Sequence, residues 1–269
     1  MEIEVDFNKT AQENADAYYK KSKKMLIKIE GAKKAIKELE RQLNAVESDK
    51  NKEQLLASKK FKIIVKKEWY ENFHWFFTSF GNLVIGGKDA SQNELINSRY
   101  FEDNDIFFHA NIFGASLVIL KNGVLSNKNE KEEVAQFAGS YSSAWKEGLS
   151  SIDVYSVKRN QVSKSTSKGS LGKGSFLISG EREWYNVSLS LVALMVNQSD
   201  IKKFNIIPKI SFDRLLEKPK NYAIINIGND EKSVAAKKIA KFFDIDINEV
   251  MQQLPNGGCK VSLSIKQNV

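Results

Sequence analysis

Two stretches of the sequence combine basic, amide and glycine residues in a way that suits phosphate and base binding. The first contains Gly86-Gly87-Lys88, followed by Gln92 and Asn93. The second has no carboxylate between Asp153 and Glu181. Basic side chains attract phosphate oxygens, glycine lets backbone N–H groups approach a phosphate, and amide side chains both donate to and accept from base edges. The candidate contact residues in and between these stretches are Gly86, Gly87, Lys88, Gln92, Asn93, Arg99, His109, Ser116, Lys158, Arg159, Gln161, Ser163, Lys164 and Lys173.

Catalytic chemistry has less support than binding. Asp89 stands where a nucleotide-hydrolysing phosphate loop would need Ser or Thr, and its carboxylate would repel phosphate. His74, His109 and Cys259 are the only histidine and cysteine residues, so soft donors cannot assemble a metal site. His109 near Asp105 could be a hydrogen-bonded histidine, an RNA contact or a general base, but no nucleophile has motif spacing to it. We therefore expect no catalytic residues, no metal and no cofactor, and we do not expect this chain to be an enzyme.

Short strands and one capped helix are expected to hold the first stretch in place. The apolar run Leu83–Ile85 before Gly86-Gly87 is typical of a buried strand that ends in a tight turn. Asp89 is a suitable N-cap for the helix predicted to follow it. Further strands are predicted at residues 106–109 and 115–120, which are rich in β-branched, aromatic and aliphatic side chains.

The second stretch lies between other predicted elements. Residues 131–146 have the periodicity of an amphipathic helix, and residues 152–157 that of a strand. Serine and glycine dominate residues 163–174, which predicts a mobile loop before a strand resumes at 174–178. The aromatic block at residues 69–77 could stack on bases if exposed, but its close spacing favours packing in the core.

The N-terminal segment predicts a long helix with a coiled-coil seam. Thr10 and Glu13 form a capping-box pair at its start. At about 1.5 Å per residue, a helix to Val46 would be roughly 50 Å long and needs a facing helix along its apolar stripe. The stripe alternates spacings of three and four residues through Ala15, Tyr18, Ser22, Met25, Ile29, Ala32, Ile36, Leu39, Leu43 and Val46. Because residues 53–60 are too short to cover it, the facing helix is expected from another chain segment or a second copy.

Composition favours a soluble chain with an anionic partner. The 269 residues carry a formal charge of +8, with 42% hydrophobic and 28% charged residues. A single cysteine excludes an internal disulfide and fits a reducing compartment. The first residues lack the basic-then-apolar order of a signal peptide, and no apolar run approaches the roughly 20 residues that span a bilayer. We expect a cytoplasmic protein without membrane contact.

The order of several short motifs resembles NFACT-R, the RNA-binding module of the NFACT (RqcH/NEMF-like) proteins of ribosome-associated quality control. The motifs are Gly86–Glu94, Asp105–Ala110, Gly114–Ile119, Tyr141–Trp145, Gln161–Lys164 and Gly172–Phe176. Residues 13–32 also resemble the descending arm of the NFACT coiled coil, and the C-terminal part is similar to the ending of archaeal members. Family members often have Arg, Asp and His in place of His74, Phe80 and Phe113, so contacts with RNA at these positions would differ.

The resemblance implies that this chain corresponds to the C-terminal portion of a longer protein. The parent would bind a stalled large ribosomal subunit that carries peptidyl-tRNA, recruit tRNA and support C-terminal alanine tailing of the nascent chain. The implied partners are tRNA, the large subunit, and either the NFACT-N domain with the ascending arm or a second copy through the heptad helix. The alternative is a coiled-coil scaffold that oligomerises and binds protein, with its basic charge serving solubility.

An α+β architecture in three parts follows from these patterns. Residues 1–60 would form the coiled-coil arm, residues 61–197 the mixed α/β RNA-binding module, and residues 198–269 a small α/β appendix. In the appendix we expect a strand at residues 222–227, a turn at residues 228–230 and a helix at residues 231–243.

Overall fold

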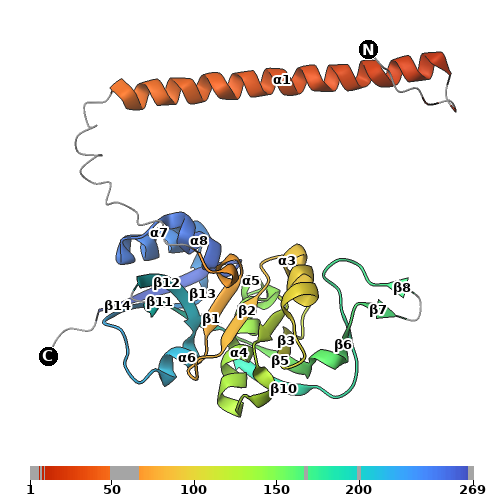
Figure 1. Ribbon diagram of the computed structural model, residues 1–269. Helices are drawn as coiled ribbons and strands as arrows, with labels where there is room; N and C mark the ends of the chain where they lie inside the picture. The colour runs from red at the N-terminus through yellow and green to blue at the C-terminus, as the bar shows by residue number, and fades with distance from the viewer. Residues whose placement is uncertain are drawn as a thin grey trace. The chain divides into compact units, whose positions relative to one another are not determined.

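The computed structural model describes residues 6, 8, 10–48, 67–166, 169–198 and 201–265. The chain divides into two compact units, Met1–Lys66 and Lys67–Val269, and each is described here by itself. The described residues form helices and antiparallel sheets, so the predicted α+β class is confirmed (Figure 1). Residues 53–60, which were expected to be too short to cover the seam, fall outside the described residues.

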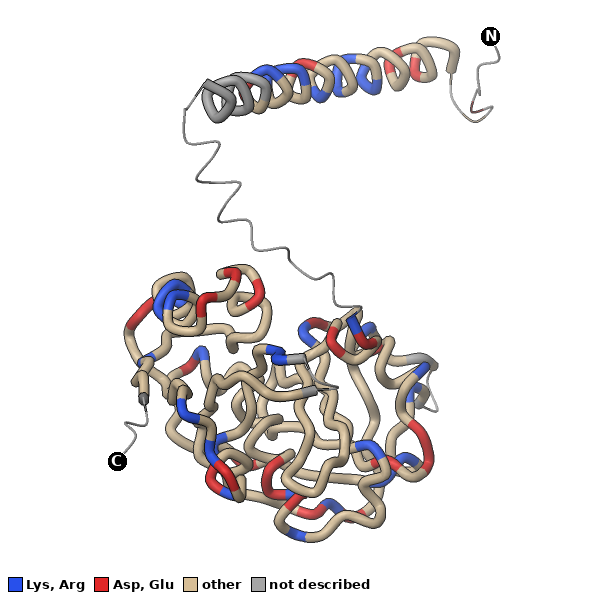
Figure 2. The backbone as a smooth tube through the Cα atoms, turned by 60° about the vertical axis from the view of Figure 1, so that its left-hand side comes forward, with Lys and Arg blue, Asp and Glu red and all other residues tan. Residues whose placement is uncertain are grey.

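The first unit contains the long helix α1, Ala11–Ser48. The predicted capping box is present, because Glu13 N donates to Thr10 Oγ1 and Thr10 N donates to Glu13 Oε2. Apolar side chains of the predicted seam are solvent-exposed along the helix, among them Tyr18, Met25, Ile29, Ile36 and Leu39. Figure 2 shows Lys and Arg interspersed with acidic residues along the same helix. An exposed heptad stripe of this length is the surface on which coiled-coil helices pair.

A six-stranded antiparallel sheet is the frame of the second unit, with strand order β1-β2-β4-β3-β5-β10. Its strands are β1 His74–Phe77, β2 Leu83–Gly86, β3 Ile106–Ala110, β4 Val118–Leu120, β5 Ser151–Lys158 and β10 Glu183–Ser188. Successive side chains of a strand point to opposite faces. Phe76 and Phe108 therefore join the core on one face, while Trp75 and Phe107 join a separate core on the other.

Helices cover both faces of this sheet. On the first face α4, Lys128–Ser140, contributes Val134 and Phe137 to the larger core. On the second face the smaller core includes Ile96 and Phe101 beside the helical segments. These segments are η1 Trp69–Asn72, α3 Ala90–Leu95 and the π-helical turn η2 Ile96–Tyr100. Because both faces are buried, the strands read as nearly continuous apolar runs, and most of the aromatic block is core, as predicted.

A four-stranded antiparallel sheet, ordered β12-β11-β13-β14, completes the second unit. Its strands are β11 Ser190–Gln198, β12 Ile201–Pro208, β13 Asn221–Asp230 and β14 Cys259–Ile265. Helices α6 Lys209–Arg214, α7 Lys232–Phe243 and α8 Ile247–Gln253 accompany it. The predicted boundary at residues 197 and 198 falls at the end of β11, and that strand pairs with β12 and β13 beyond the boundary. Side chains of α4 and of this sheet share one hydrophobic core.

Three local predictions differ from the structure. The helix predicted at residues 131–146 is two helices, α4 and α5 Ser143–Lys146, because Ser142 caps the second by accepting from Ala144 N. The turn predicted at residues 228–230 is the bulged end of β13. The loop predicted at residues 163–174 contains the strand pair β7 Ser165–Thr166 and β8 Gly169–Ser170, and β6 Val162–Ser163 pairs with β9 Leu177–Ile178 at its base. The remaining short elements of the second unit are η3 Gly123–Leu125 and η4 Arg159–Gln161.

Within the part of the chain that the structure describes, no helix combines the length and apolarity needed to cross a bilayer.

Candidate nucleic-acid interface

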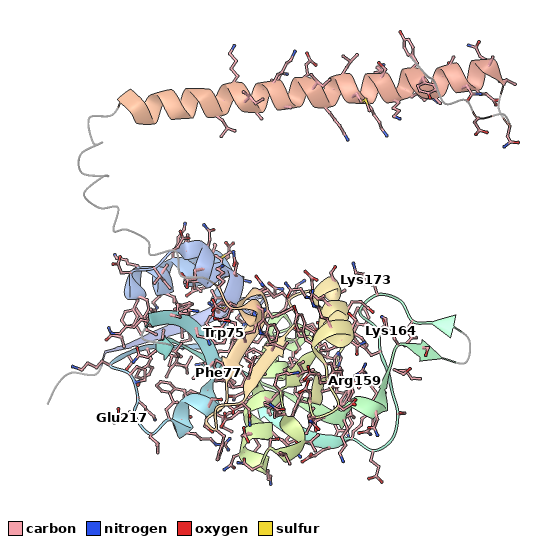
Figure 3. The ribbon with its side chains drawn as sticks, viewed as in Figure 1. Trp75, Phe77, Arg159, Lys164, Lys173 and Glu217 are labelled. Atoms are coloured by element: carbon pink, nitrogen blue, oxygen red, sulfur yellow. The ribbon has the colours of Figure 1, made fainter. Side chains whose placement is uncertain are left out.

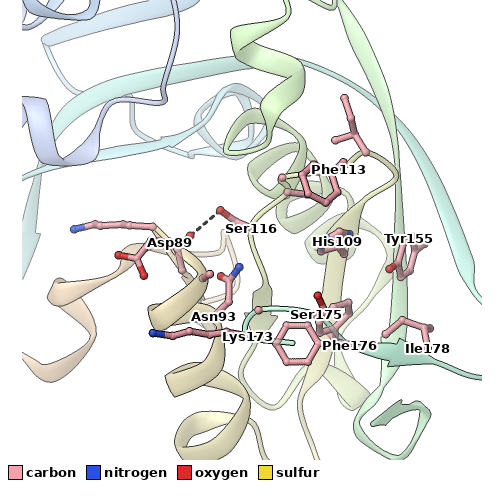
Figure 4. A pocket seen from close by; sticks show the side chains of 18 residues that line it. Asp89, Asn93, His109, Phe113, Ser116, Tyr155, Lys173, Ser175, Phe176 and Ile178 are labelled. Carbon is pink, nitrogen blue, oxygen red and sulfur yellow. Dashed lines mark hydrogen bonds between the residues drawn. The ribbon is translucent and has the colours of Figure 1, made fainter. Parts of the chain in front are cut away.

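A pocket of about 460 Å³ opens on the second face of the six-stranded sheet. It is bounded by the start of α3, by β3 and the loop after it, by β5, and by the segment that leads into β9 (Figure 4). The lining residues are Gly87, Lys88, Asp89, Ala90, Asn93, Phe107, His109, Ile112, Phe113, Gly114, Ala115, Ser116, Tyr155, Lys173, Gly174, Ser175, Phe176 and Ile178. Segments as distant in the sequence as Gly87 and Ile178 thus enclose one space.

One side of the pocket is aromatic. Phe107 lies nearly parallel to His109, with 6.0 Å between ring centroids, and edge-on to Phe176 at 6.3 Å. The Tyr155 ring is 5.8 Å from His109 and carries the Arg182 guanidinium 4.6 Å from its centroid. Phe113, at the rim, is 98% exposed and has no side-chain packing that would explain its position. Phe107 and Tyr155 are buried, so the ring faces that an unpaired base can reach are those of Phe113 and, in part, Phe176.

The other side is polar and basic. Asn93 is buried, and its Oδ1 accepts from Leu117 N at 3.1 Å, which leaves the Nδ2 group to donate to a ligand. Lys88 is partly buried and Lys173 is exposed, and neither makes a salt bridge with a carboxylate of the described residues. Figure 4 shows Asn93 on the opposite side of the pocket from His109 and Tyr155, with the Lys173 side chain extending away from the aromatic rings.

Position 87 requires glycine because the backbone there lies close to the Asn93 side chain, not because a ligand contacts it. A Cβ atom at this position would lie 2.1 Å from Asn93 Oδ1, so any larger residue would displace α3 from the sheet. The Gly87 N–H donates to Leu117 O at 3.0 Å, and Ser116 Oγ donates to Gly87 O at 2.7 Å (dashed in Figure 4). The Lys88 N–H is likewise engaged with Gln92 Oε1. These backbone groups shape the pocket and are not available to a phosphate.

Residues 72–180 match the family model for the NFACT protein RNA binding domain. The chain is 37% identical to the archaeal Rqc2 homolog aRqcH of Methanocaldococcus jannaschii over 209 residues, which are 75% of this chain and 30% of that protein. The chain belongs to the NFACT family. It is also 36% identical to the Ribosome quality control complex subunit NEMF homolog of Drosophila melanogaster, over 68% of this chain and 18% of that protein. The chain therefore spans less than a third of the length of these relatives.

The solved structures that are similar to this chain include the C-terminal part of the fibronectin/fibrinogen-binding protein from Streptococcus suis. The match covers 66% of this chain and 76% of the Streptococcus suis chain. The TM-score is 0.39 and the sequence identity 16%, so this likeness carries no argument about the NFACT pocket.

Six of the predicted contact residues line the pocket of this NFACT domain. They are Gly87, Lys88, Asn93, His109, Ser116 and Lys173. Four segments supply them, and the order β2-β4-β3-β5 of the sheet brings these segments together. Gly86, in contrast, is buried within β2, where a Cβ would lie 3.1 Å from Val118 Cγ2. Gln92 bridges the chain by donating to Asn72 O and accepting from Lys88 N.

Two of the four described basic residues of the second stretch are engaged by the protein itself. Lys164 Nζ lies 2.6 Å from Glu94 Oε2 of α3, and this lysine lowers the pKa of the Glu94 carboxyl. The Arg159 guanidinium lies 4.7 Å from the centroid of the Phe101 ring and donates to Val162 O. The predicted acid-free loop is thus neutralised in part by a carboxylate from α3. Among the described cations of the loop, Lys173 lines the pocket, together with Lys88 from the turn after β2. Figure 3 labels Arg159, Lys164 and Lys173 on this part of the chain.

The remaining predicted contacts lie away from the pocket. Arg99 is exposed on η2, with its guanidinium 5.7 Å from the centroid of the Tyr100 ring. Gln161 donates to Ser179 O and Glu181 O, which closes the base of the β6–β9 segment. Ser163 Oγ donates to Ser165 O, and Lys158 lies in a separate hollow beside Gln161 and Arg182. Whether these residues touch RNA stays a prediction.

The aromatic side of the pocket was missed by sequence reasoning. Phe107, Tyr155 and Phe176 read as ordinary core residues, and Phe113 was noted only as a departure from the family pattern. The single available signal was the position of Phe113 beside Gly114, since a large apolar residue next to a glycine break is suited to an exposed loop tip. The pairing of β3 with β5, which brings Phe107 and Tyr155 together, and the path of the chain that brings Phe176 to them have no local signature.

His109 is held neutral and has no acid–base partner in the described chain. Burial is the main cause that lowers the pKa of its imidazole to about 4. Asp105 accepts hydrogen bonds from Lys121 Nζ and from the backbone of Glu102 and Asn122, so it does not orient His109. The general-base alternative has no geometric support in this arrangement, whereas a neutral imidazole can exchange hydrogen bonds with a base.

The low pKa of His109 predicts a loss of stability in mild acid. The unfolded chain, with a pKa near 6.5, binds this proton more readily than the folded one, so stability falls as pH drops from 6.5 toward 4. Near pH 5 the expected loss is about 2 kcal/mol. The H109Q variant, which cannot titrate there, should lose correspondingly less stability than the parent chain between pH 7 and 5 in urea unfolding. Because His74 is present in both proteins, its titration cancels; an equal pH dependence would contradict the assignment.

Proposed function

We propose that this NFACT chain is the RNA-binding portion of a ribosome quality control factor and that it holds an unpaired nucleotide in the pocket beside α3. One observation supports the proposal most directly. A single pocket of the NFACT RNA-binding domain contains aromatic side chains, an amide donor and lysines that form no salt bridge with the described carboxylates. Aromatic rings favour base stacking, and the lysines favour the flanking phosphates.

The whole-protein role is inferred from the relatives. The name of the Drosophila melanogaster relative describes it as a homolog of a ribosome quality control complex subunit. This chain matches that relative and the archaeal aRqcH over two thirds of its length or more. We propose that the RNA is tRNA on a stalled large ribosomal subunit and that binding supports C-terminal alanine tailing. The chain acts by binding and positioning, since its described residues offer an RNA surface and no paired acid and base.

A scaffold function is the second candidate, and one observation favours it. The apolar stripe of α1 is exposed along the helix, and such a stripe pairs with another helix. The two candidates differ in their response to salt. The logarithm of the RNA affinity falls linearly with the logarithm of the salt concentration. The affinity of coiled-coil pairing between apolar side chains changes little with salt.

Lys173 offers a direct test of the RNA proposal. In K173A the loss of one phosphate contact should lower tRNA affinity roughly fivefold at 0.15 M salt and reduce the salt slope by about one. The measurement is fluorescence anisotropy with labelled tRNA over a salt series. Because Lys173 is exposed, the melting temperature should not change. Lys220 is also exposed and lies outside the pocket, so K220A is the matched control. If K173A and K220A bind tRNA with equal affinity, this pocket does not take part in RNA binding.

A further inference from the structure

A second, smaller pocket of about 230 Å³ adjoins the first. The two share Lys88, Gly114 and Ser116, so they are neighbouring hollows on one surface. Regions distant in sequence meet at the second pocket: β1 supplies His74, α5 supplies Lys146, and the turn after α8 supplies Asn256. The C-terminal region, which the family model does not cover, therefore contributes to this site.

The charge of this pocket is positive and uncompensated. Lys88 and Lys146 line it, and Lys232 Nζ donates to the Oδ1 of the lining residue Asn256 at 3.1 Å. No carboxylate is among the lining residues, and these lysines form no salt bridge with the described carboxylates. Burial, with the charges of Lys67 and Lys232, lowers the pKa of Lys88. Cations held together in this way repel one another, and a bound anion would offset that repulsion.

Two neutral side chains of the pocket, His74 and Asn256, offer N–H groups. The hydroxyl groups that line it already donate to backbone carbonyls. His74 stacks on Tyr141, with ring centroids 4.0 Å apart, and Tyr141 Oη is fixed by donating to Gln253 O. Burial, together with Lys88 and Lys232, lowers the pKa of His74 well below its usual value, so its ring is neutral and carries one N–H. Its Nδ1 is buried and has no hydrogen-bond partner among the described residues. Because Asn256 Oδ1 is occupied by Lys232, its Nδ2 remains to donate.

We propose that this second pocket is an anion site that takes one phosphate group of an RNA strand whose base occupies the first pocket. Ammonium and N–H donors without carboxylates are the chemistry that recognises phosphate oxygens. The neighbouring aromatic pocket suits the base of the same strand, and the shared Lys88 lies between the two. The assignment of the phosphate to RNA rests on the proposed function, while the anion site itself does not.

The two histidines allow the pockets to be observed separately. The chain contains only His74 and His109, one in each pocket, so an NMR spectrum of the imidazole groups has two sets of signals. The H109Q variant assigns them. Inorganic phosphate, titrated against sodium chloride of equal ionic strength, should shift the His74 signal saturably and leave His109 largely unchanged. No phosphate-specific shift, or a shift at His109 alone, would overturn the anion site.

Lys146 tests whether the phosphate belongs to RNA. Its side chain is exposed, so K146A should fold normally, and K237A on the exposed side of α7 is the matched control. K146A should weaken tRNA binding roughly fivefold at 0.15 M salt and reduce the salt slope by about one, while K237A should match the parent chain. If K146A and K237A bind tRNA equally while phosphate still shifts His74, the site binds free phosphate and the RNA assignment is wrong. If the parent chain does not bind tRNA but phosphate shifts His74, the anion site stands and the proposed function fails.

Discussion

Replacing Phe113 with alanine should weaken tRNA binding by roughly five- to 150-fold, because stacking of a base on an aromatic ring contributes about 1–3 kcal/mol. Phe113 lies at the rim of the first pocket, and its ring is 98% exposed in the RNA-free chain. An exposed phenylalanine at the mouth of a basic pocket gains burial only when a ligand arrives. The change should appear in anisotropy titrations with labelled tRNA.

The F113A variant should keep the stability of the parent chain. The Phe113 carbonyl accepts from Ser143 Oγ at 2.7 Å, and this backbone contact does not depend on the side chain. Exposed side chains without packing contacts usually alter stability by less than about 0.5 kcal/mol. Leu125 is similarly exposed, at 93%, and lies outside the pocket, so L125A is the matched control. If F113A and L125A bind tRNA with equal affinity, base stacking is not how this pocket acts.

Replacing Asp105 with alanine should cost roughly 3–5 kcal/mol of unfolding free energy, the range expected when one partner of a buried ion pair is removed. The Asp105 side chain is fully buried and lies 2.6 Å from Lys121 Nζ, whose side chain is only 16% exposed. The same carboxylate accepts from Glu102 N and Asn122 N. It thereby joins the segment after η2 to the turn after β4.

Glu102 provides the control for this prediction. Its carboxylate also pairs with Lys121, at 2.9 Å, but the side chain is 72% exposed, so E102Q should cost at most about 1 kcal/mol. Urea unfolding of the parent chain, D105A and E102Q measures the difference. If D105A does not fold, D105N can replace it, because asparagine retains the side-chain volume and one acceptor. The loss of unfolding free energy in D105N should be larger than in E102Q and smaller than that expected for D105A. A cost for D105A no greater than that of E102Q would show that the buried pair is not a main source of stability.

Signals between near neighbours in sequence were sufficient for much of the fold. Asp89 was predicted to cap a helix, and it does so by accepting from Gln92 N. Thr10 and Glu13 likewise form the expected capping box. The apolar runs at residues 83–85, 106–109 and 152–157 became strands of the six-stranded sheet. Caps and periodicity depend on groups a few residues apart, so the sequence alone determines them.

Competition between local and long-range contacts explains where the sequence predictions were wrong. The periodicity across residues 131–146 is helical, yet Ser142 ends one helix and caps the next. Lys164 and Arg159 lie in a segment whose composition suits contact with RNA. In the structure, however, Lys164 forms a salt bridge with Glu94, and the Arg159 guanidinium lies over the Phe101 ring. Composition reports which charges a segment carries, but it does not report which distant residue will neutralise them.

By itself, the sequence determined the elements, the NFACT family and the residue types suited to RNA. Only the tertiary structure decided which of those residues face one space. The antiparallel register places Phe107 beside Val157 and His109 beside Tyr155, and the segment before β9 then brings Lys173 and Phe176 to the same pocket. A pocket of this kind depends on non-local strand pairing and on the burial that selects it, and neither is encoded in any single stretch of the chain.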